Sequence, residues 1–328
     1  LDHVFEQKRA TCLVNPLACR ETEILIRAVA RKRKLAVVGA GPAGLAAATT
    51  AAARGHAVTL FEAASEIGGQ FNMAKRVPGK EEFHETLRYF RRRLELTGVE
   101  VRLGEEVTAA SLKAGGFDAV VLATGVLPRD PGIPGMDHPK TLSYIDVLLK
   151  AKPVGKRVAI VGAGGIGFDV AEFLVQAVPS PSLDAHRYLE EWGVDERYAS
   201  RGGLMKPHVE PPAREIYLLQ RTPSRPGRTL GKTTGWAHRA SLKAHKVEML
   251  GGVDYLRIDD AGLHVTVHGE PRLLAVDNVV ICAGQLSRRD LQTALEGVET
   301  HLIGGARLAG ELDAKRAIEE GVRLAASL

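Results

Sequence analysis

A glycine motif between a buried strand and a helix occurs twice in this 328-residue chain, and it constrains the fold more than any other feature. The first copy has Gly39, Gly41 and Gly44 between the apolar run 35–38 and an alanine-rich run at 45–53. These patterns predict a buried parallel strand followed by a helix. In such a unit the first glycine permits a tight turn, the second lets a pyrophosphate approach the backbone, and the third lets the helix pack on the strand. The motif therefore predicts a dinucleotide site at the start of the helix.

The second copy has Gly162, Gly164 and Gly167, again after an apolar run (157–161) and before a helical run (168–176). Two such units predict two nucleotide sites. We therefore expect an α/β fold with two Rossmann-like three-layer domains, the second inserted into a discontinuous first. We place the first domain at 31–148 and 281–328, the second at 149–280, and a linker at 1–30.

Further residues of the first unit fit a dinucleotide site. Glu62 follows the predicted strand 57–61 and lies 21 residues after Gly41, where an acidic side chain binds ribose hydroxyls. Gly69 belongs to a glycine pair, which lets the chain pass a flat ligand without a side-chain clash. Gly125 ends another buried strand at a turn. These positions complete the first candidate site.

The second unit differs at the acidic position. Its next predicted strand, 215–220, is followed by Arg221 in place of an acid. Arginine at this position suits the 2′-phosphate of NADP(H), so the sequence favours NADPH over NADH. Arg225 and Lys232 are predicted to add positive charge to the same pocket. A surface arginine at a strand end, without a ligand, remains the alternative for Arg221.

Two more segments of the second domain stand out. The connection 178–214 is long for this architecture, and we expect an insertion over the cofactor or against a partner domain. The alternation at 263–274 around His268-Gly269 predicts a small antiparallel hairpin.

The composition excludes several classes of protein. The formal net charge of +5 is spread along the chain, so we expect no nucleic-acid partner. No apolar run reaches the length of a membrane span, so we expect no membrane partner. Three cysteines (Cys12, Cys19 and Cys282) are too few for a disulfide framework and indicate the reducing cytoplasm. They include no closely spaced redox pair, which argues against a disulfide reductase.

The chain resembles the two-dinucleotide-binding flavoprotein superfamily over nearly its whole length. More narrowly, it is similar to the C-terminal part of bacterial NADPH-dependent 2,4-dienoyl-CoA reductases. The stretches that carry the resemblance are Thr11–Pro16, Ile67–Asn72, Pro78–Phe83, Gly231–Trp236, His301–Gly305 and Glu311–Ala314.

The resemblance implies that the first site holds FAD. Many superfamily members bind the flavin ribityl chain with a Gly-Asp pair near the C-terminus, where this chain has Gly304-Gly305. That contact is therefore expected from the Gly304 backbone and from the region of Asp313. The full set of implied FAD contacts is Gly39, Gly41, Ala43, Gly44, Glu62, Gly69, Gln70, Lys80, Val107, Gly125, Gly304 and Asp313.

The resemblance also implies a larger enzyme of unsaturated fatty-acid β-oxidation. Hydride passes from NADPH to FAD, and electrons then pass through a 4Fe-4S cluster to FMN in an N-terminal barrel. Cys12 matches the fourth cluster cysteine, and the other three are absent from this sequence. The chain begins at Leu1 rather than Met, so we expect a fragment that carries out the NADPH-to-FAD half-reaction, with the barrel as its partner. No catalytic side chain is expected, because the cofactors carry the chemistry.

Two alternatives remain open. In the first, the chain is a relative of barrel-containing amine dehydrogenases whose second nucleotide site has lost its role. In the second, it is a structural lobe that binds ADP or FAD without catalysis. The intact glycines of the second motif, with Arg221, argue against the first alternative. Missing flavin absorbance in purified protein would favour the second.

Overall fold

The computed structural model describes residues 2–176, 179–310 and 313–328. The chain forms two compact units. Unit 1 contains Leu1–Asn72, Glu82–Leu127 and Gln285–Leu328, and unit 2 contains Met73–Glu81 and Pro128–Gly284. The residues Glu311-Leu312 of the C-terminal motif lie outside the described residues.

Unit 1 is built on a five-stranded sheet in the order β15-β4-β1-β2-β3, in which every pair is parallel. Buried strands of this kind need both faces covered, and their sequences are nearly continuous apolar runs. The strands are β1 (Lys34–Val38), β2 (Ala57–Glu62), β3 (Glu100–Leu103), β4 (Ala119–Leu122) and β15 (Thr300–Leu302).

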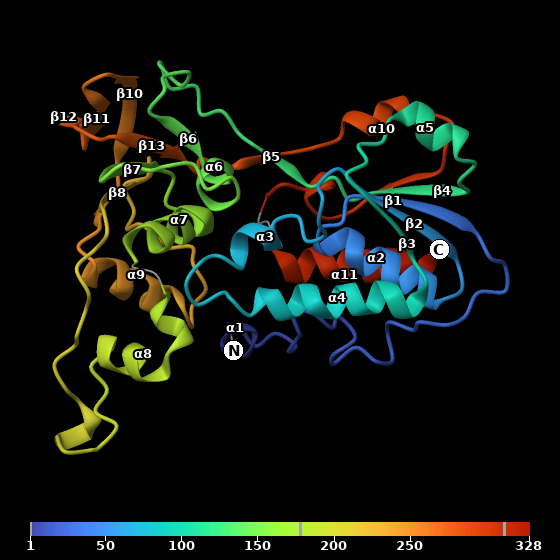
Figure 1. The fold of residues 1–328 in the computed structure, drawn as a ribbon, viewed down its shortest axis with the longest axis horizontal. Helices are drawn as coiled ribbons and strands as arrows, with labels where there is room; N and C mark the ends of the chain where they lie inside the picture. Colours follow the sequence, from blue (N-terminus) through green and yellow to red (C-terminus); the bar gives the residue numbers. More distant parts are fainter. Residues whose placement is uncertain (1, 177–178, 311–312) are drawn as a thin grey trace. The chain divides into compact units, whose positions relative to one another are not determined.

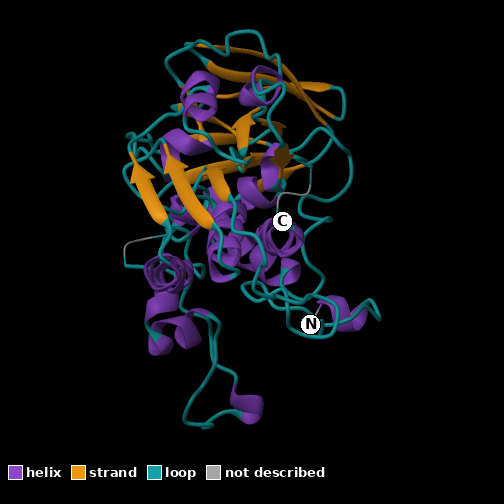
Figure 2. Ribbon diagram, turned by 90° about the vertical axis from the view of Figure 1, so that its right-hand side faces the viewer, coloured by secondary structure: helices purple, strands orange, loops and turns teal. Residues whose placement is uncertain are grey.

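Alternate residues of the unit 1 strands face two different layers, because side chains in a strand point to opposite faces. Leu35 and Val37 join one core with the helices α2 (Pro42–Ala53), α4 (Phe83–Thr97) and α11 (Ala314–Ser327), which Figure 1 shows side by side. Ala36 and Val38 join a second core with α5 (Ala109–Ala114) and the end of α10 (Asp290–Ala294). Figure 2 shows the strands above the larger helical layer.

Close backbone approach explains the alanine-rich sequence of α2. A Cβ atom on Gly321 of α11 would lie 2.4 Å from the carbonyl oxygen of Ala43 and 3.0 Å from the amide of Ala47. Only small side chains allow two helices to pack at this distance. The contact fixes α2, and with it the glycine turn that precedes it.

Unit 2 repeats the plan with the sheet order β6-β13-β7-β8-β9, again parallel throughout. Figure 1 shows α7 and α9 beside these strands. The elements are β6 (Thr141–Ser143), β7 (Arg157–Val161), β8 (Glu215–Leu219), β9 (Glu248–Leu250) and β13 (Asn278–Ile281), with helices α6 (Tyr144–Leu148), α7 (Gly165–Val175) and α9 (Gly235–Ala244).

The third layer of unit 2 is a sheet instead of helices. The strands β10 (Val253–Asp259), β11 (Gly262–Val267) and β12 (Glu270–Leu274) form an antiparallel sheet that packs on the β7 and β13 residues Ala159 and Val279. The predicted hairpin is confirmed as β11–β12, and His268 and Gly269 at its turn both have positive φ. The expected α/β class with two Rossmann-like three-layer domains is confirmed.

The long connection of unit 2 contains short helical segments. Trp192, at the end of α8, contacts Trp236 of α9 with the ring centroids 6.1 Å apart. The elements of this connection are η1 (Pro181–Leu183), α8 (Ala185–Glu191) and η2 (Arg201–Gly203). The remaining elements of the chain are α1 (Asp2–Phe5), α3 (Phe71–Ala74), β5 (Val126–Pro128), β14 (Gln285–Ser287) and η3 (Gly304–Ala306).

The units differ from the expected domain boundaries in four places. Residues 281–284, expected in the first domain, belong to unit 2. Residues 128–148, expected in the first domain, belong to unit 2, because β6 completes its sheet beside β13. Residues 73–81 also belong to unit 2. The expected linker 1–30 packs on unit 1, where Ile24 is buried and Arg20 forms an ion pair with Glu319 at 3.2 Å.

Candidate dinucleotide sites

The first glycine turn has the geometry that a pyrophosphate site needs. Gly39 has φ +103°, and a Cβ atom there would lie 2.4 Å from the Ala123 carbonyl oxygen. A Cβ atom on Gly44 would lie 1.8 Å from the Gly39 carbonyl oxygen, so these two glycines are needed for packing. A Cβ atom on Gly41 would meet nothing within 4 Å. Gly41 therefore faces open space at the N-terminus of α2, where backbone N–H groups attract phosphate.

The second turn repeats each of these relationships. A Cβ atom on Gly162 would lie 2.4 Å from the Cys282 carbonyl oxygen, and one on Gly167 would lie 1.8 Å from the Gly162 carbonyl oxygen. Gly164, like Gly41, faces open space at the start of its helix. Both motifs therefore form the same strand–turn–helix structure, with one glycine of each left free to face a ligand.

Glu62 is held against the first turn by backbone hydrogen bonds. Its carboxylate accepts from the Ala40 amide at 2.7 Å and from the Ala64 amide at 3.0 Å. The amide of Glu105 donates to the Glu62 carbonyl at 3.0 Å, so the loop that leads to the buried Val107 begins beside Glu62. The structure thus brings Glu62 and the Val107 loop together at the end of the strands.

The glycine pair also lies against the turn. The Gly68 amide donates to the Ala40 carbonyl at 2.8 Å, and a Cβ atom on Gly69 would lie 3.0 Å from the Gly41 Cα. Gln70 follows and is half-buried. Any side chain at position 69 would crowd the turn, which explains the glycine there.

Ala43, Gly125 and Gly304 converge on the same part of unit 1. A Cβ atom on Gly304, which has φ +60°, would lie 2.8 Å from the Ala43 Cβ. A Cβ atom on the next residue, Gly305, would lie 3.2 Å from the Gly125 Cα. The Gly304 amide donates to the Glu320 carboxylate at 2.7 Å. Glu320 is therefore an acidic group at this site that the sequence patterns did not indicate.

Two expected FAD residues make side-chain contacts within the protein. Asp313 caps α11, where its carboxylate accepts from the Lys315 amide at 2.8 Å. Lys80 lies in unit 2, and its Nζ forms an ion pair with Asp169 of α7 at 2.6 Å. The structure therefore does not place Lys80 within unit 1 beside the other expected contacts.

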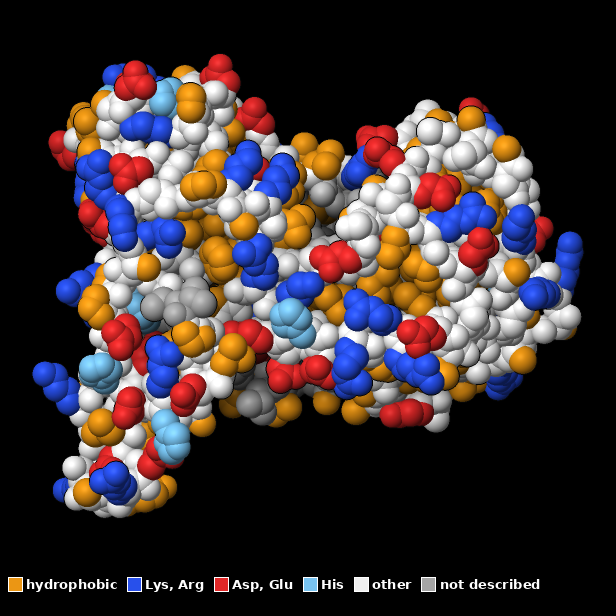
Figure 3. Space-filling model, viewed as in Figure 1, with side chains coloured by type: hydrophobic (Ala, Val, Ile, Leu, Met, Phe, Trp, Pro, Cys, Tyr) orange, Lys and Arg blue, Asp and Glu red, His pale blue; other side chains and the backbone are white. Residues whose placement is uncertain are grey.

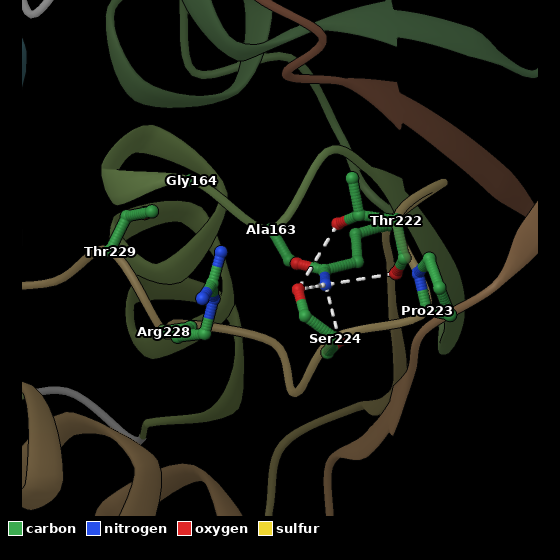
Figure 4. Close-up of a pocket in the computed structure, with 8 residues that line it drawn as sticks. Ala163, Gly164, Thr222, Pro223, Ser224, Arg228 and Thr229 are labelled. Carbon is green, nitrogen blue, oxygen red and sulfur yellow. Dashed lines mark hydrogen bonds between the residues drawn. The ribbon is translucent and has the colours of Figure 1, made fainter.

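A pocket of about 490 Å³ opens beside the second glycine turn. Figure 4 shows Arg228 across from the segment Thr222–Ser224, with its guanidinium toward Gly164. The pocket is lined by Ala163, Gly164, Gln220, Thr222, Pro223, Ser224, Arg228 and Thr229. An arginine beside a helix N-terminus suits an anionic ligand.

The structure corrects the position that matches Glu62. β8 ends at Leu219, one residue earlier than expected. The Gly39 amide donates to the Phe61 carbonyl at 2.8 Å, and the Gly162 amide donates to the Leu219 carbonyl at 2.9 Å. The residue after each acceptor is therefore equivalent, and the counterpart of Glu62 is Gln220 rather than Arg221.

The three expected cations of the second site are all exposed: Arg221, Arg225 and Lys232. Arg221 lies near Tyr255 of β10. Burial raises the pKa of the Tyr255 hydroxyl, and the positive charge of Arg221 partly offsets this rise. The pocket lining includes none of these three cations and includes Arg228 instead. Sequence reasoning missed Arg228, because nothing in the local pattern distinguishes it from the neighbouring Arg225.

A hydrogen-bonded pair of a half-buried histidine and a buried glutamate joins α7 to α9. His238 Nδ1 lies 2.7 Å from Glu172 Oε1, and the Glu172 side chain is only 7% exposed. The hydrogen bond to Glu172 raises the pKa of His238 above its ordinary value. The pair fixes the helix that follows the pocket loop against the helix that begins at the glycine turn.

The cysteines show no redox or metal arrangement in the part of the chain that the structure describes. Cys12 and Cys19 are exposed, and all three cysteines are free. Burial raises the pKa of the Cys282 thiol, so Cys282 is a poor nucleophile. Among residues 2–176, 179–310 and 313–328, no group of three or more His, Cys, Asp or Glu side chains could hold a metal ion. No helix in these ranges is long and apolar enough to cross a membrane.

Comparison with known proteins identifies the family of the chain. Residues 33–309 match the family model described as pyridine nucleotide-disulphide oxidoreductase. The metal reductase of Desulforamulus reducens is 32% identical over 309 residues, which cover 92% of this chain and 45% of that protein. The cinnamate reductase of Clostridium sporogenes is 28% identical over 92% of this chain and 39% of its own length.

A solved structure of another reductase is also similar to this chain. The complex of 2-naphthoyl-CoA reductase with 2-naphthoyl-CoA superimposes with a TM-score of 0.83 and 26% identity, covering 99% of this chain and 44% of that one. The chain spans less than half the length of each of these three relatives. By its matched family model and its two glycine turns, the chain belongs to the pyridine nucleotide-disulphide oxidoreductase family.

Proposed function

We propose that this chain binds FAD in unit 1 and NADPH in unit 2, and transfers a hydride from NADPH to FAD. The observation that carries the proposal is the repeated turn geometry, in which Gly41 and Gly164 face open space while the other motif glycines are packed against backbone. Duplicated turns of this kind suit two dinucleotides in one chain.

Unit 1 would hold FAD through backbone and one carboxylate. The open face of Gly41 and the N-terminus of α2 suit the pyrophosphate, and Glu62 suits the ribose hydroxyls. Gly69, Gln70, Gly125 and Gly304 would line the remaining length of the cofactor, with Val107 near the adenine. When bound, the two cofactors supply the hydride chemistry themselves, and the side chains bind and orient them.

Unit 2 is proposed to prefer NADPH to NADH. Its turn carries the neutral Gln220 at the ribose position, and Arg228 lines the pocket. Arg221, Arg225 and Lys232 add positive charge nearby. A 2′-phosphate gains from these cations and meets no carboxylate at position 220, whereas an acid there would favour the ribose hydroxyls of NADH.

For the protein as a whole, we propose a 2,4-dienoyl-CoA reductase. The motifs from Thr11–Pro16 to His301–Gly305 support this proposal, and so does the similarity to a reductase solved with an aryl-CoA ligand. In that enzyme Cys12 would be one ligand of a 4Fe-4S cluster, and FMN and the dienoyl-CoA site would lie in the barrel. The relatives, which are more than twice as long, leave room for such a barrel.

Oxidation of NADPH with ferricyanide as acceptor tests the proposal on the FAD-reconstituted chain. We expect FAD-dependent turnover and a kcat/KM for NADPH that exceeds the value for NADH by more than tenfold. Turnover with neither coenzyme would contradict the hydride-transfer function. The substrate assignment needs a separate test on protein that includes the barrel, in which NADPH oxidation should depend on added 2,4-dienoyl-CoA.

A further inference from the structure

We propose that Glu320 of α11 is a positioning residue for the flavin half of FAD, because its carboxylate holds the buried segment Gly304–Ala306 in place. This inference rests on the proposed FAD site of unit 1. Glu320 would act through the backbone of the segment and would not touch the cofactor itself. Loss of its carboxylate should therefore weaken the binding of FAD, whereas ADP, which lacks the flavin half, should bind as before.

The Glu320 carboxylate binds both the segment and two arginines. Its Oε2 accepts from the Gly304 amide at 2.7 Å. Its Oε1 accepts from the guanidinium of Arg307 at 2.6 Å and from that of Arg316 at 3.2 Å. The Gly304 amide is thus bonded within the protein instead of being offered to a ligand. Glu320 therefore fixes the first residue of the segment to α11.

Other side chains, from β14 and the turn that follows it, hold the carbonyl groups of the segment. The Ser287 hydroxyl donates to the Gly305 carbonyl at 2.7 Å, and Arg289 Nε donates to the Ala306 carbonyl at 2.7 Å. These two side chains act as donors, so they do not replace the acceptor that Glu320 supplies. A buried amide needs an acceptor, and removal of the carboxylate is therefore expected to let the segment move.

The segment meets the first glycine turn at the end that lies away from Glu62. The Glu62 carboxylate accepts from the Ala40 amide at 2.7 Å, whereas a Cβ atom on Gly304 would lie 2.8 Å from the Ala43 Cβ. Because Glu62 is proposed to bind the ribose of the ADP half, the segment suits the half of FAD on the other side of the pyrophosphate. A shift of the segment should then disturb the flavin half and leave the ADP half bound.

Burial separates Glu320 from the ion pairs of the protein surface. Acidic and basic side chains are mixed over the face shown in Figure 3, and exposed pairs of that kind contribute little to stability. The Glu320 side chain is only 15% exposed. Burial raises the pKa of its carboxyl, but hydrogen bonds from Arg307 and Gly304 outweigh this effect and hold the pKa below its ordinary value. Glu320 is therefore ionised at neutral pH, and the hydrogen bonds that it accepts are stronger than those between neutral groups.

The experiment measures the affinities of FAD and of ADP for the full chain freed of FAD, by titration calorimetry. The variants are Glu320→Ala, which removes the acceptor, and Glu320→Gln, which keeps an acceptor for the Gly304 amide but loses the charge. Glu319→Ala is the matched control, because Glu319 lies on the same helix, is 22% exposed and pairs with Arg20 and Arg323. The Tm of each variant establishes that it is folded.

We expect Glu320→Ala to weaken FAD about tenfold or more, as the loss of a hydrogen bond to a charged group implies, and to leave the affinity for ADP unchanged. Glu320→Gln should lower the ratio of the two affinities less, and Glu319→Ala should leave the ratio unchanged.

A Glu320→Ala variant that keeps the wild-type affinity for FAD, or that weakens FAD and ADP equally, overturns the role of Glu320. If this variant does not fold, Glu320→Gln decides, and an unchanged ratio there overturns the role as well. Wild-type protein that binds neither FAD nor ADP contradicts the proposed FAD site itself, which is a separate failure.

Discussion

Glu62 and Gln220 occupy the same position in the two units of this protein, each directly after the strand residue whose carbonyl accepts the amide of the first motif glycine. The Glu62 carboxylate returns to the glycine turn, whereas the Gln220 amide turns away to the loop at Thr222–Ser224. The same strand–turn–helix geometry is therefore used twice, with a carboxylate in one unit and a neutral amide in the other at the position proposed to meet the ribose. The two sites are expected to select different dinucleotides for this reason.

Removing the charge of Glu62 should weaken FAD binding. A charged acceptor to a ribose hydroxyl contributes roughly 1.5–3 kcal/mol, so Glu62→Gln should raise the Kd for FAD about tenfold to 100-fold. Flavin retained per chain after gel filtration measures the effect. Retention equal to that of the wild type would show that Glu62 does not contact the cofactor. Glu66→Gln, four residues further on at an exposed position, is the control.

Two alanine substitutions in the second motif should separate packing from binding. Gly167→Ala puts a Cβ atom 1.8 Å from the Gly162 carbonyl oxygen, so it should lower Tm by several degrees or prevent folding. Gly164→Ala meets no protein atom within 4 Å, so Tm should stay near the wild-type value while NADPH binding weakens. Thermal melts and NADPH titrations of both variants test this. Equal Tm losses would contradict the assignment of Gly164 to the ligand side.

Because α2 and α11 are in close contact, we expect a glycine-to-alanine exchange in α11 to destabilise the protein, although this exchange usually stabilises a helix. Alanine is favoured over glycine in a helix interior by about 1 kcal/mol. At Gly321, however, the added Cβ would lie 2.4 Å from the Ala43 carbonyl oxygen, and such overpacking costs roughly 1–3 kcal/mol. Gly321→Ala should therefore lower the free energy of unfolding in a denaturant titration. Gly310→Ala, where the nearest atom is 3.9 Å away, should leave it nearly unchanged.

The Glu172–His238 pair should make the stability of unit 2 depend on pH. The pKa of His238 is raised in the folded protein by its hydrogen bond to Glu172, with Lys80 and Asp169 as the nearby charges. The stabilisation from protonated His238 is therefore complete below its unfolded pKa of about 6.5 and is lost as pH rises through the raised folded pKa.

A neutral replacement isolates that charge. His238→Gln can still donate a hydrogen bond to Glu172, so the wild type should exceed it in Tm at a pH of about 6, and the gap should close in alkaline buffer. A Tm difference that stays constant from acid to alkaline pH would show that the pair contributes no proton-linked stability.

The sequence predicted the parts of the fold that depend on local patterns. The two glycine turns, the parallel strands that precede them and the β11–β12 hairpin follow from spacing and apolar runs, and the structure confirms them. The end of β8 was misplaced by one residue because Gln220 continues the strand pattern, although the β7–β8 pairing stops at Val161 and Leu219.

What the sequence could not supply are relationships between distant segments. Arg228 enters the pocket because its loop passes back beside Gly164, and Glu172 meets His238 only after α9 packs on α7. The contact of Gly304 with Ala43 joins residues that are 261 positions apart. The resemblance to a known family indicated Gly304 and Lys80, but it could not indicate the ion pair between Lys80 and Asp169.

The measurement that tests the central claim most directly is anaerobic titration of the FAD-reconstituted chain with NADPH and, in parallel, with NADH, following the visible absorbance of the flavin. Hydride transfer from unit 2 to unit 1 predicts rapid bleaching by about one equivalent of NADPH and much weaker bleaching by NADH. Flavin that binds and is bleached by neither coenzyme would contradict the account and would leave a lobe that binds FAD without reducing it.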